Sequence, residues 1–107
     1  MVSVLGNNPE LGLPLTHALV TVFDAETGAP AALMGGEVLI AIRTGAGNGV
    51  AMDLLSRIDA SKAATLGSGI QAKTQLEAIC CVRDIKKARV FSLHYEHAQR
   101  FVDEMKE

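Results

Sequence analysis

The sequence predicts an α/β fold in which a parallel sheet with helices follows an antiparallel hairpin. Three observations lead to this prediction. Two apolar runs flank a short turn at residues 24–28, and elements in the order β-α-β-α fill the second half of the chain. The third is composition, because 107 residues with 49% hydrophobic and only 4% aromatic content suit one small aliphatic core. We therefore expect one compact domain.

The first third of the chain is rich in strand-forming residues and turn signals. The expected elements are a strand, a loop, a strand, a turn and a strand, at 1–5, 6–14, 17–23, 24–28 and 29–34. Gly28 can supply a positive φ in the turn, and Pro30 is typical of an edge strand or of the entry to a strand. The last two strands therefore form the predicted hairpin.

The middle of the chain holds an apolar, β-branched run and then an unusual number of glycines. Residues 37–42 are expected to form a strand, followed by a helix over 45–56. Gly45, Gly47 and Gly49 lie at the start of this helix, where glycine lets another backbone or a ligand approach closely.

The second half predicts alternating strands and helices. These elements are strand 62–66, helix 70–82, strand 88–93 and helix 94–106. The helices are expected to bury apolar side chains on one face, namely Leu76, Ile79 and Cys80, and then Ala98, Phe101, Val102 and Met105. Cys80 and Cys81 are interpreted as small hydrophobic residues rather than a redox or metal site, and His94 and His97 are expected to face solvent.

Charge and hydropathy exclude several partners. The net charge of −2 and the lack of a basic, aromatic-rich cluster argue against nucleic-acid binding. The N-terminus lacks the basic and apolar regions of a signal peptide, and no apolar run approaches the length of a membrane span. We therefore expect a cytoplasmic protein with neither a nucleic-acid nor a membrane partner.

A glycine-rich motif joins the strand at 62–66 to the helix that follows. Gly67-x-Gly69-x-x-Ala72 has the spacing of a dinucleotide-binding turn. The first glycine permits the tight turn, the second lets a pyrophosphate approach, and Ala72 allows close packing of helix and strand. The helix N-terminus then faces the anion. The motif predicts a partial Rossmann-like sheet that binds NAD or NADP; a merely structural turn is the alternative.

The residue at the end of the next strand bears on the choice of cofactor. An Asp or Glu there usually holds the adenosine ribose hydroxyls, but this chain has Ser92. A small polar residue tolerates the 2′-phosphate of NADP, and it is equally compatible with a site that has decayed.

Arg43 is the other candidate binding residue. It follows the strand expected at 37–42 and precedes the glycine-rich helix start, so its guanidinium is placed to bind a carboxylate or phosphate. A surface salt bridge is the alternative. No paired carboxylates, triad or metal-ligand spacing is present, so no catalytic residue and no metal site is assigned.

Several segments resemble the ornithine cyclodeaminase/mu-crystallin family, particularly its archaeal alanine dehydrogenases. These segments are Asn8–Pro14, Thr27–Met34, Arg43–Ala46, Gly67–Ala72 and Gln75–Ala78, and they span nearly the whole chain. Members of this family are NAD(P)-dependent enzymes or binders that act on small amino acids, imines or keto acids. They combine a substrate and dimerisation domain with a Rossmann domain.

The resemblance implies a division of the chain and roles for its motifs. Residues 1–42 correspond to a remnant of the substrate domain, and 43–107 to the first βαβα part of the Rossmann domain. Arg43 matches the arginine that binds the substrate carboxylate. The residues that match the cofactor loop are Gly67, Ser68, Gly69, Ile70 and Gln71, with Ser92 at the ribose position.

The chain also departs from the family pattern. A two-domain enzyme of this kind needs roughly 300 residues. The family's catalytic lysine would precede a segment like residues 1–4, and its catalytic aspartate would lie in the later half of the Rossmann domain. Leu15, Gly35 and Ser92 stand where the family usually has Thr, Asp and the ribose-binding acid.

Three functions follow from these observations. The first is a catalytically incomplete fragment that retains weak NAD(P) binding and forms a homo-oligomer through its exposed edges. The second is an active amino-acid dehydrogenase or cyclodeaminase assembled from several copies, with a small amino acid or keto acid as its ligand. The third is an interaction module.

Overall fold

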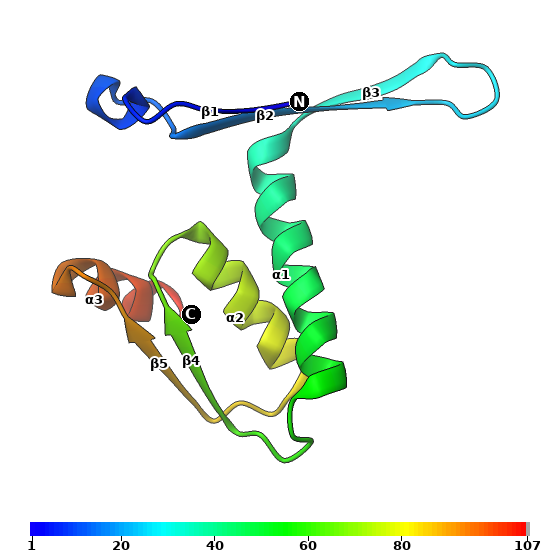
Figure 1. Cartoon of the computed structure of the whole chain (residues 1–107). Coiled ribbons are helices and arrows are strands. Elements are labelled where there is room, and N and C mark those ends of the chain that lie inside the picture. The colour runs from blue at the N-terminus through cyan, green and yellow to red at the C-terminus, as the bar shows by residue number, and fades with distance from the viewer. Residues whose placement is uncertain (107) are drawn as a thin grey trace. The chain divides into compact units, whose positions relative to one another are not determined.

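The computed structural model describes residues 1–106 and is an α/β structure, as predicted (Figure 1). Its elements are β1 (Val2–Val4), the 3-10 helix η1 (Asn8–Leu11), β2 (Thr16–Phe23), β3 (Pro30–Gly35), α1 (Gly36–Leu55), β4 (Lys62–Leu66), α2 (Ile70–Val82), β5 (Lys87–Phe91) and α3 (Tyr95–Glu104). The sequence predicts one compact domain with parts 1–42 and 43–107; contacts within the chain group it into two compact units, with the boundary in the sequence between Ile40 and Ala41.

The first unit is an antiparallel sheet of three strands in the order β1-β2-β3. The β2–β3 pairing confirms the predicted hairpin, with Thr21 opposite Leu33 and a register shift next to Phe23. Pro30 begins β3 at the edge of this sheet, as expected for a residue without a backbone donor. The loop expected at 6–14 contains η1.

The hairpin turn is stabilised by its own first residue. One carboxylate oxygen of Asp24 accepts hydrogen bonds from the backbone N–H groups of Glu26 and Thr27 at 3.1 and 2.7 Å and from the Thr27 hydroxyl at 2.7 Å. These bonds, chiefly those from Thr27, hold the pKa of Asp24 below its usual value. Gly28 has φ +72°, which confirms the left-handed conformation predicted from the sequence.

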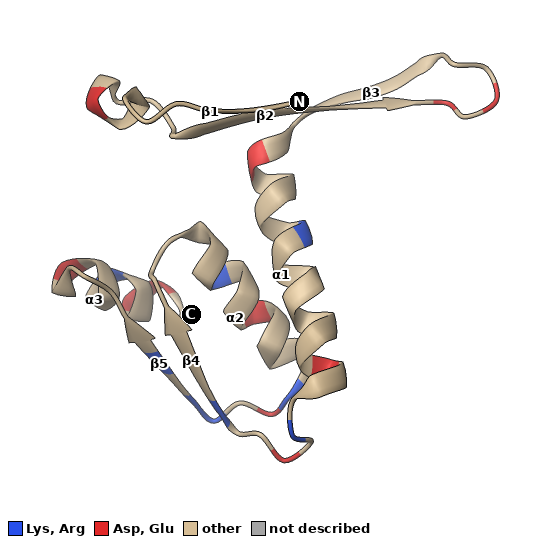
Figure 2. Cartoon of the chain, in the orientation of Figure 1, with Lys and Arg blue, Asp and Glu red and all other residues tan. Residues whose placement is uncertain are grey.

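The sheet of the first unit is apolar and largely exposed. Its strands carry no Lys, Arg, Asp or Glu, and the charged side chains of this unit lie in η1, in the hairpin turn and at the start of α1 (Figure 2). Leu19 and Leu33 keep 37% and 67% of their surface exposed. Both are on the face that also carries Thr21, because residues directly opposite in an antiparallel pair share a face.

The second unit has a parallel sheet formed by β4 and β5, with Lys62 opposite Lys87 and Leu66 opposite Phe91. As predicted, a helix follows each strand (Figure 1). The parallel order places the carboxyl ends of both strands and the N-termini of α2 and α3 at one edge of this sheet.

The core of the second unit is small. Its buried apolar side chains among the described residues are those of Ala41, Leu76 and Phe101, so the expected inward faces of α2 and α3 are confirmed at Leu76 and Phe101. The prediction that Cys80 is buried is wrong, since both cysteines are exposed. Partial burial and the neighbouring Cys81 raise the pKa of the Cys80 thiol. His94 and His97 are exposed, as expected.

The strand predicted at 37–42 is also wrong. These residues belong to α1, which begins at Gly36 and continues without a break to Leu55. A short apolar run does not distinguish a strand from a buried helix by periodicity alone, and its β-branched content favoured the strand. The buried positions of α1 in the second unit are Ala41, Gly45 and Gly49, spaced four residues apart. A search for large apolar residues overlooks such a stripe.

The glycines of α1 permit close contact with another backbone, namely α2. A Cβ placed on Gly45 would lie 2.5 Å from the carbonyl oxygen of Thr74, and one on Gly49 would lie 3.1 Å from the Cβ of Ala78. By contrast, a Cβ on Gly47 would meet no atom within 4 Å among the described residues. The first and third glycines therefore set the distance between the two helices, whereas the second does not.

As one continuous helix, α1 is long and apolar enough to cross a membrane by length and composition alone. The sequence instead predicts a strand over 37–42 and a helix over 45–56, and neither of these segments is long enough to span a membrane. The core helix of a globular protein meets the same test, and the contacts of Gly45 and Gly49 with α2 are those of a packed helix.

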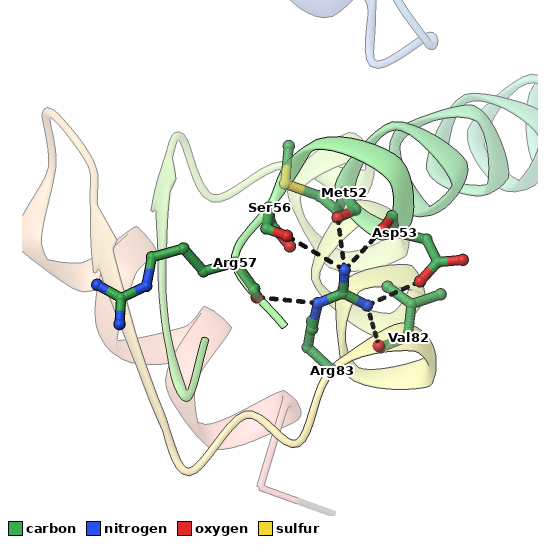
Figure 3. Close-up of polar contacts among 6 residues, drawn as sticks. All are labelled: Met52, Asp53, Ser56, Arg57, Val82 and Arg83. Carbon is green, nitrogen blue, oxygen red and sulfur yellow. Dashed lines mark hydrogen bonds and ion pairs between the residues drawn. The ribbon is translucent and has the colours of Figure 1, made fainter. Parts of the chain in front are cut away.

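The C-terminal ends of α1 and α2 are joined by Arg83, whose side chain is only 8% exposed (Figure 3). Its guanidinium donates to the Asp53 carboxylate at 2.7 Å and to the backbone carbonyls of Met52, Asp53, Ser56, Arg57 and Val82. The last carbonyls of a helix have no partner within the helix and carry partial negative charge. One cation therefore satisfies the ends of two helices.

We expect Gly45→Ala to destabilise the protein by about 1–3 kcal/mol, because the added methyl group would overlap backbone atoms that cannot move independently. Gly47→Ala is the matched control. It adds the same methyl group in open space, and it should leave stability unchanged or raise it by up to about 1 kcal/mol through helix propensity. Urea unfolding followed by circular dichroism compares them, and equal midpoints would disprove the packing role of Gly45.

We expect Arg83→Gln to cost about 2 kcal/mol or more, because several carbonyls and one carboxylate lose their shared donor. Arg83→Lys should recover part of this loss at most, since an ammonium lacks the planar fork of donors. Arg57→Gln is the control, because Arg57 is 83% exposed and pairs only with its neighbour Asp59 among the described residues. An unfolding midpoint for Arg83→Gln equal to that of the control would contradict the capping role.

Candidate functional site

The loop between β4 and α2 has the backbone geometry that its glycines predict. Gly67 has φ +113°, a conformation that residues with a side chain rarely adopt. Its N–H donates to the carbonyl of Phe91 at 2.8 Å, which ties the loop to the end of β5. The first glycine of the motif is therefore required by the turn itself.

The second glycine has a different role. Gly69 is the N-cap residue of α2 in an extended conformation, φ −84° and ψ −177°, which any residue can adopt. A Cβ at this position would meet no atom within 4 Å in the part of the chain that the structure describes. Its backbone therefore has open space beside it, which a side chain would fill and which a ligand can approach.

The start of α2 presents backbone donors without a side-chain acceptor. Among residues 1–106 no side chain caps this helix, and no acidic residue lies in its first turn. The N–H groups of Ala72 and Lys73 donate back to the carbonyl of Gly69, so helical bonding begins there. Ile70 and Gln71 lie at the helix start, where N–H groups and the helix dipole favour an anion.

Ser68 and Ser92 lie together, although 24 residues separate them in the sequence. Ser68 follows β4 and Ser92 follows β5, and their hydroxyl oxygens are 3.0 Å apart in a hydrogen bond. Both residues are half-buried. The structure thus brings the loop residue and the proposed ribose-position residue into direct contact at the carboxyl edge of the sheet.

The loop lies between two cavities of the second unit. The larger, of about 700 Å³, is lined by the late part of α1, by β4, by Gly67 and Gly69, and by the inner face of α2. Three of its lining residues, Ser56, Thr65 and Gln71, each have a buried side-chain oxygen with no hydrogen-bond partner among the described residues. Buried polar atoms normally have partners, so this surface is suited to receive further polar groups.

The smaller cavity, of about 430 Å³, lies on the other side of the loop, between the start of α2 and α3. Ser68 and Gly69 form its loop side. Lys73, His97 and Arg100 bring positive or donor groups to it, and Glu104 brings a carboxylate that pairs with Lys73. The sequence motif does not predict these side chains, because the motif includes only the loop and the periodicity of α3 indicates only its apolar face.

The prediction that Arg43 follows a strand is wrong. It lies within α1 rather than at the end of a strand, its side chain is exposed, and it lines neither of the two cavities. The error follows from the strand wrongly expected at 37–42. Among the described residues Arg43 has no ion-pair partner, so the surface salt bridge is also not found there.

These features fit the diphosphate and adenosine part of a dinucleotide. The open backbone at Gly69 and the uncapped start of α2 match a diphosphate, and the Ser68–Ser92 pair offers hydroxyl groups to a ribose. The geometry supplies binding groups only. In the described part of the chain no cluster of three or more His, Cys, Asp or Glu residues is arranged to hold a metal ion.

All 107 residues match the ornithine cyclodeaminase/mu-crystallin family. One relative is the Δ(1)-pyrroline-2-carboxylate reductase of Bacillus cereus (strain ZK / E33L). All 107 residues of this chain align with it at 37% identity, and the alignment covers 33% of that protein. The chain therefore spans about a third of the length of the curated relatives that it matches.

Two solved structures are similar over 98% of the chain. One is the Δ(1)-pyrroline-2-carboxylate reductase of Thermococcus litoralis in complex with NADH and L-proline, with TM-score 0.91 and 45% identity over 32% of its chain. The other is an archaeal alanine dehydrogenase dimer with bound NAD, with TM-score 0.93 and 35% identity over 33% of its chain. With the family match over every residue, these likenesses show that the chain belongs to the ornithine cyclodeaminase/mu-crystallin family.

Proposed function

We propose that the second unit forms the diphosphate- and adenosine-binding half of an NAD(P) site. The observation that carries this proposal is the turn at Gly67–Gly69, where the first glycine is needed for its positive φ and the second faces open space. Similar proteins with bound NADH or NAD support it. A structural turn would need the first glycine, but nothing among the described residues requires the second.

The substrate class follows from the chemistry that the relatives share. Pyrroline-2-carboxylate, proline and alanine each carry a carboxylate next to the carbon that bears nitrogen. We propose that a whole protein containing this chain acts on a small amino acid or on its imine or keto acid. When bound, the nicotinamide cofactor supplies or accepts the hydride. Arg43 is the proposed partner of the substrate carboxylate, because it matches the family's arginine and presents an exposed guanidinium.

By themselves, the 107 residues are proposed to bind cofactor weakly and to supply no proton-transfer group. The described residues provide one side of the site, and the cavity beside it is wide. Their role is to bind and orient, through backbone donors at the start of α2 and hydroxyl groups at the ends of β4 and β5. We propose that the first unit is part of a substrate and dimerisation domain and that the second unit is part of the cofactor-binding domain.

Cofactor binding is tested by titrating the purified chain with NADH and NADPH and following nicotinamide fluorescence. We expect saturable binding that Gly69→Asp abolishes, because a carboxylate would occupy the open space and repel the diphosphate. Gly47→Asp is the matched control, since it places the same charge in open space on α1 and should bind normally. If neither cofactor binds up to millimolar concentration, the proposal fails.

We further propose that the chain self-associates through the apolar sheet of its first unit. That sheet exposes Leu19 and Leu33 on one face and has no charged residue in its strands to discourage pairing. The similar archaeal alanine dehydrogenase is a dimer. A homo-oligomer would remove these side chains from water without any change in the fold.

Sedimentation velocity over a range of concentrations tests this association. Leu33→Lys should raise the dissociation constant of the oligomer about tenfold or more, because a charge would be buried in the interface. Leu55→Lys is the control, since Leu55 is 83% exposed but lies at the end of α1 outside the sheet. A wild-type chain that is monomeric throughout would refute the proposal.

A further inference from the structure

The smaller cavity beside the glycine loop is lined by cationic and donor side chains that the glycine motif itself does not include. Lys73 comes from α2 and Arg100 from α3, and His97 lies one helical turn before Arg100 on the same side of α3. Ser68 lines the same cavity, and its hydroxyl donates to that of Ser92 at the end of β5.

The charges of this cavity do not cancel. The Lys73 ammonium pairs with the Glu104 carboxylate, so these two groups largely neutralise each other. Arg100 is exposed and pairs with no carboxylate in the described part of the chain. The cavity therefore has one net positive charge from Arg100 and a further donor in the His97 ring. Glu96, in the first turn of α3, is not among its lining residues.

The end of β5 lacks the group that would oppose a phosphate. An acidic residue at this position would hold the ribose 2′-hydroxyl and would repel a phosphate attached to it. Ser92 is neutral, and its hydroxyl is held 3.0 Å from that of Ser68, so the pair offers two neutral polar groups. The neutral ribose-position residue is thus bonded to a serine that lines the same cavity as an arginine without an acidic partner among the described residues. A neutral ribose position with an arginine nearby is the arrangement that accommodates a 2′-phosphate.

We propose that this site selects NADP(H) over NAD(H), and that Arg100 binds the 2′-phosphate with help from Ser68 and Ser92. The inference rests on the proposed cofactor site and adds its specificity. A guanidinium presents a rigid fork of donors that matches phosphate oxygens, so Arg100 is the principal determinant. Ser68 and Ser92 position the ribose and leave room for the phosphate, and the Lys73–Glu104 pair keeps the nearby carboxylate neutralised.

The test compares adenosine 2′,5′-bisphosphate (2′,5′-ADP) with 5′-AMP by calorimetry, because these probes differ only in the 2′-phosphate. We expect the wild-type chain to bind 2′,5′-ADP about tenfold or more tightly than 5′-AMP. Arg100→Gln should bring this ratio close to one while 5′-AMP binding stays within about twofold. Arg89→Gln is the matched control, since it removes the same charge from an exposed position outside this cavity and should keep the preference.

Ser92→Asp provides an independent second variant. It introduces a carboxylate at the ribose position, and it should weaken 2′,5′-ADP binding at least tenfold while 5′-AMP binding is retained or improved. If the wild-type chain binds both probes equally, or if Arg100→Gln keeps the preference, the inference is overturned and the cofactor site still stands. If neither probe binds up to millimolar concentration, the cofactor site and the inference both fail.

Discussion

The close contact between α1 and α2 is the constraint on which the second unit depends. Gly45 packs so closely against the backbone of Thr74 that no side chain would fit on it. Gly49 packs against Ala78, where an added Cβ would make a tight contact. Arg83 then joins the two C-terminal ends. Fixed at its middle and at its end, α2 has a defined direction. Its N-terminus carries the loop residues of the candidate site, so helix packing determines where the backbone donors point.

This arrangement explains why a site can be made from so few side chains. A helix start supplies partial positive charge and N–H groups without any functional side chain, provided that no protein group occupies it. Here the glycine at position 69 keeps the approach open, and Gly67 turns the chain sharply enough to connect β4 to the helix. Selection between NAD(H) and NADP(H) would then depend on side chains at the edge of the site. Here the ribose position is the neutral Ser92, whereas a site that holds the ribose hydroxyls usually has an Asp or Glu there.

Part of this structure could be predicted from the sequence, because the relevant signals are local. Gly28 and Pro30 indicate the hairpin, and Gly67 with Gly69 indicates a turn between strand and helix, since each residue acts through its own backbone. The strand expected at 37–42 failed, because what decides that segment is a stripe of small residues against another helix. Long-range partners leave little local trace, so Arg83 and Arg100 were overlooked, and so was the exposure of Cys80.

Three buried side-chain oxygens beside the loop have no hydrogen-bond partner among the described residues. Ser56, Thr65 and Gln71 come from α1, β4 and α2, yet they converge on the larger cavity. An unsatisfied buried polar atom costs about 1–3 kcal/mol, and a domain of this size has only about 5–15 kcal/mol of net stability. Ordered water, a cofactor or additional protein would each satisfy them, and the last two would also cover the open side of the loop. The buried polar atoms without partners among the described residues thus lie beside the candidate site, so a group bound there would stabilise the second unit as well as occupy the cavity.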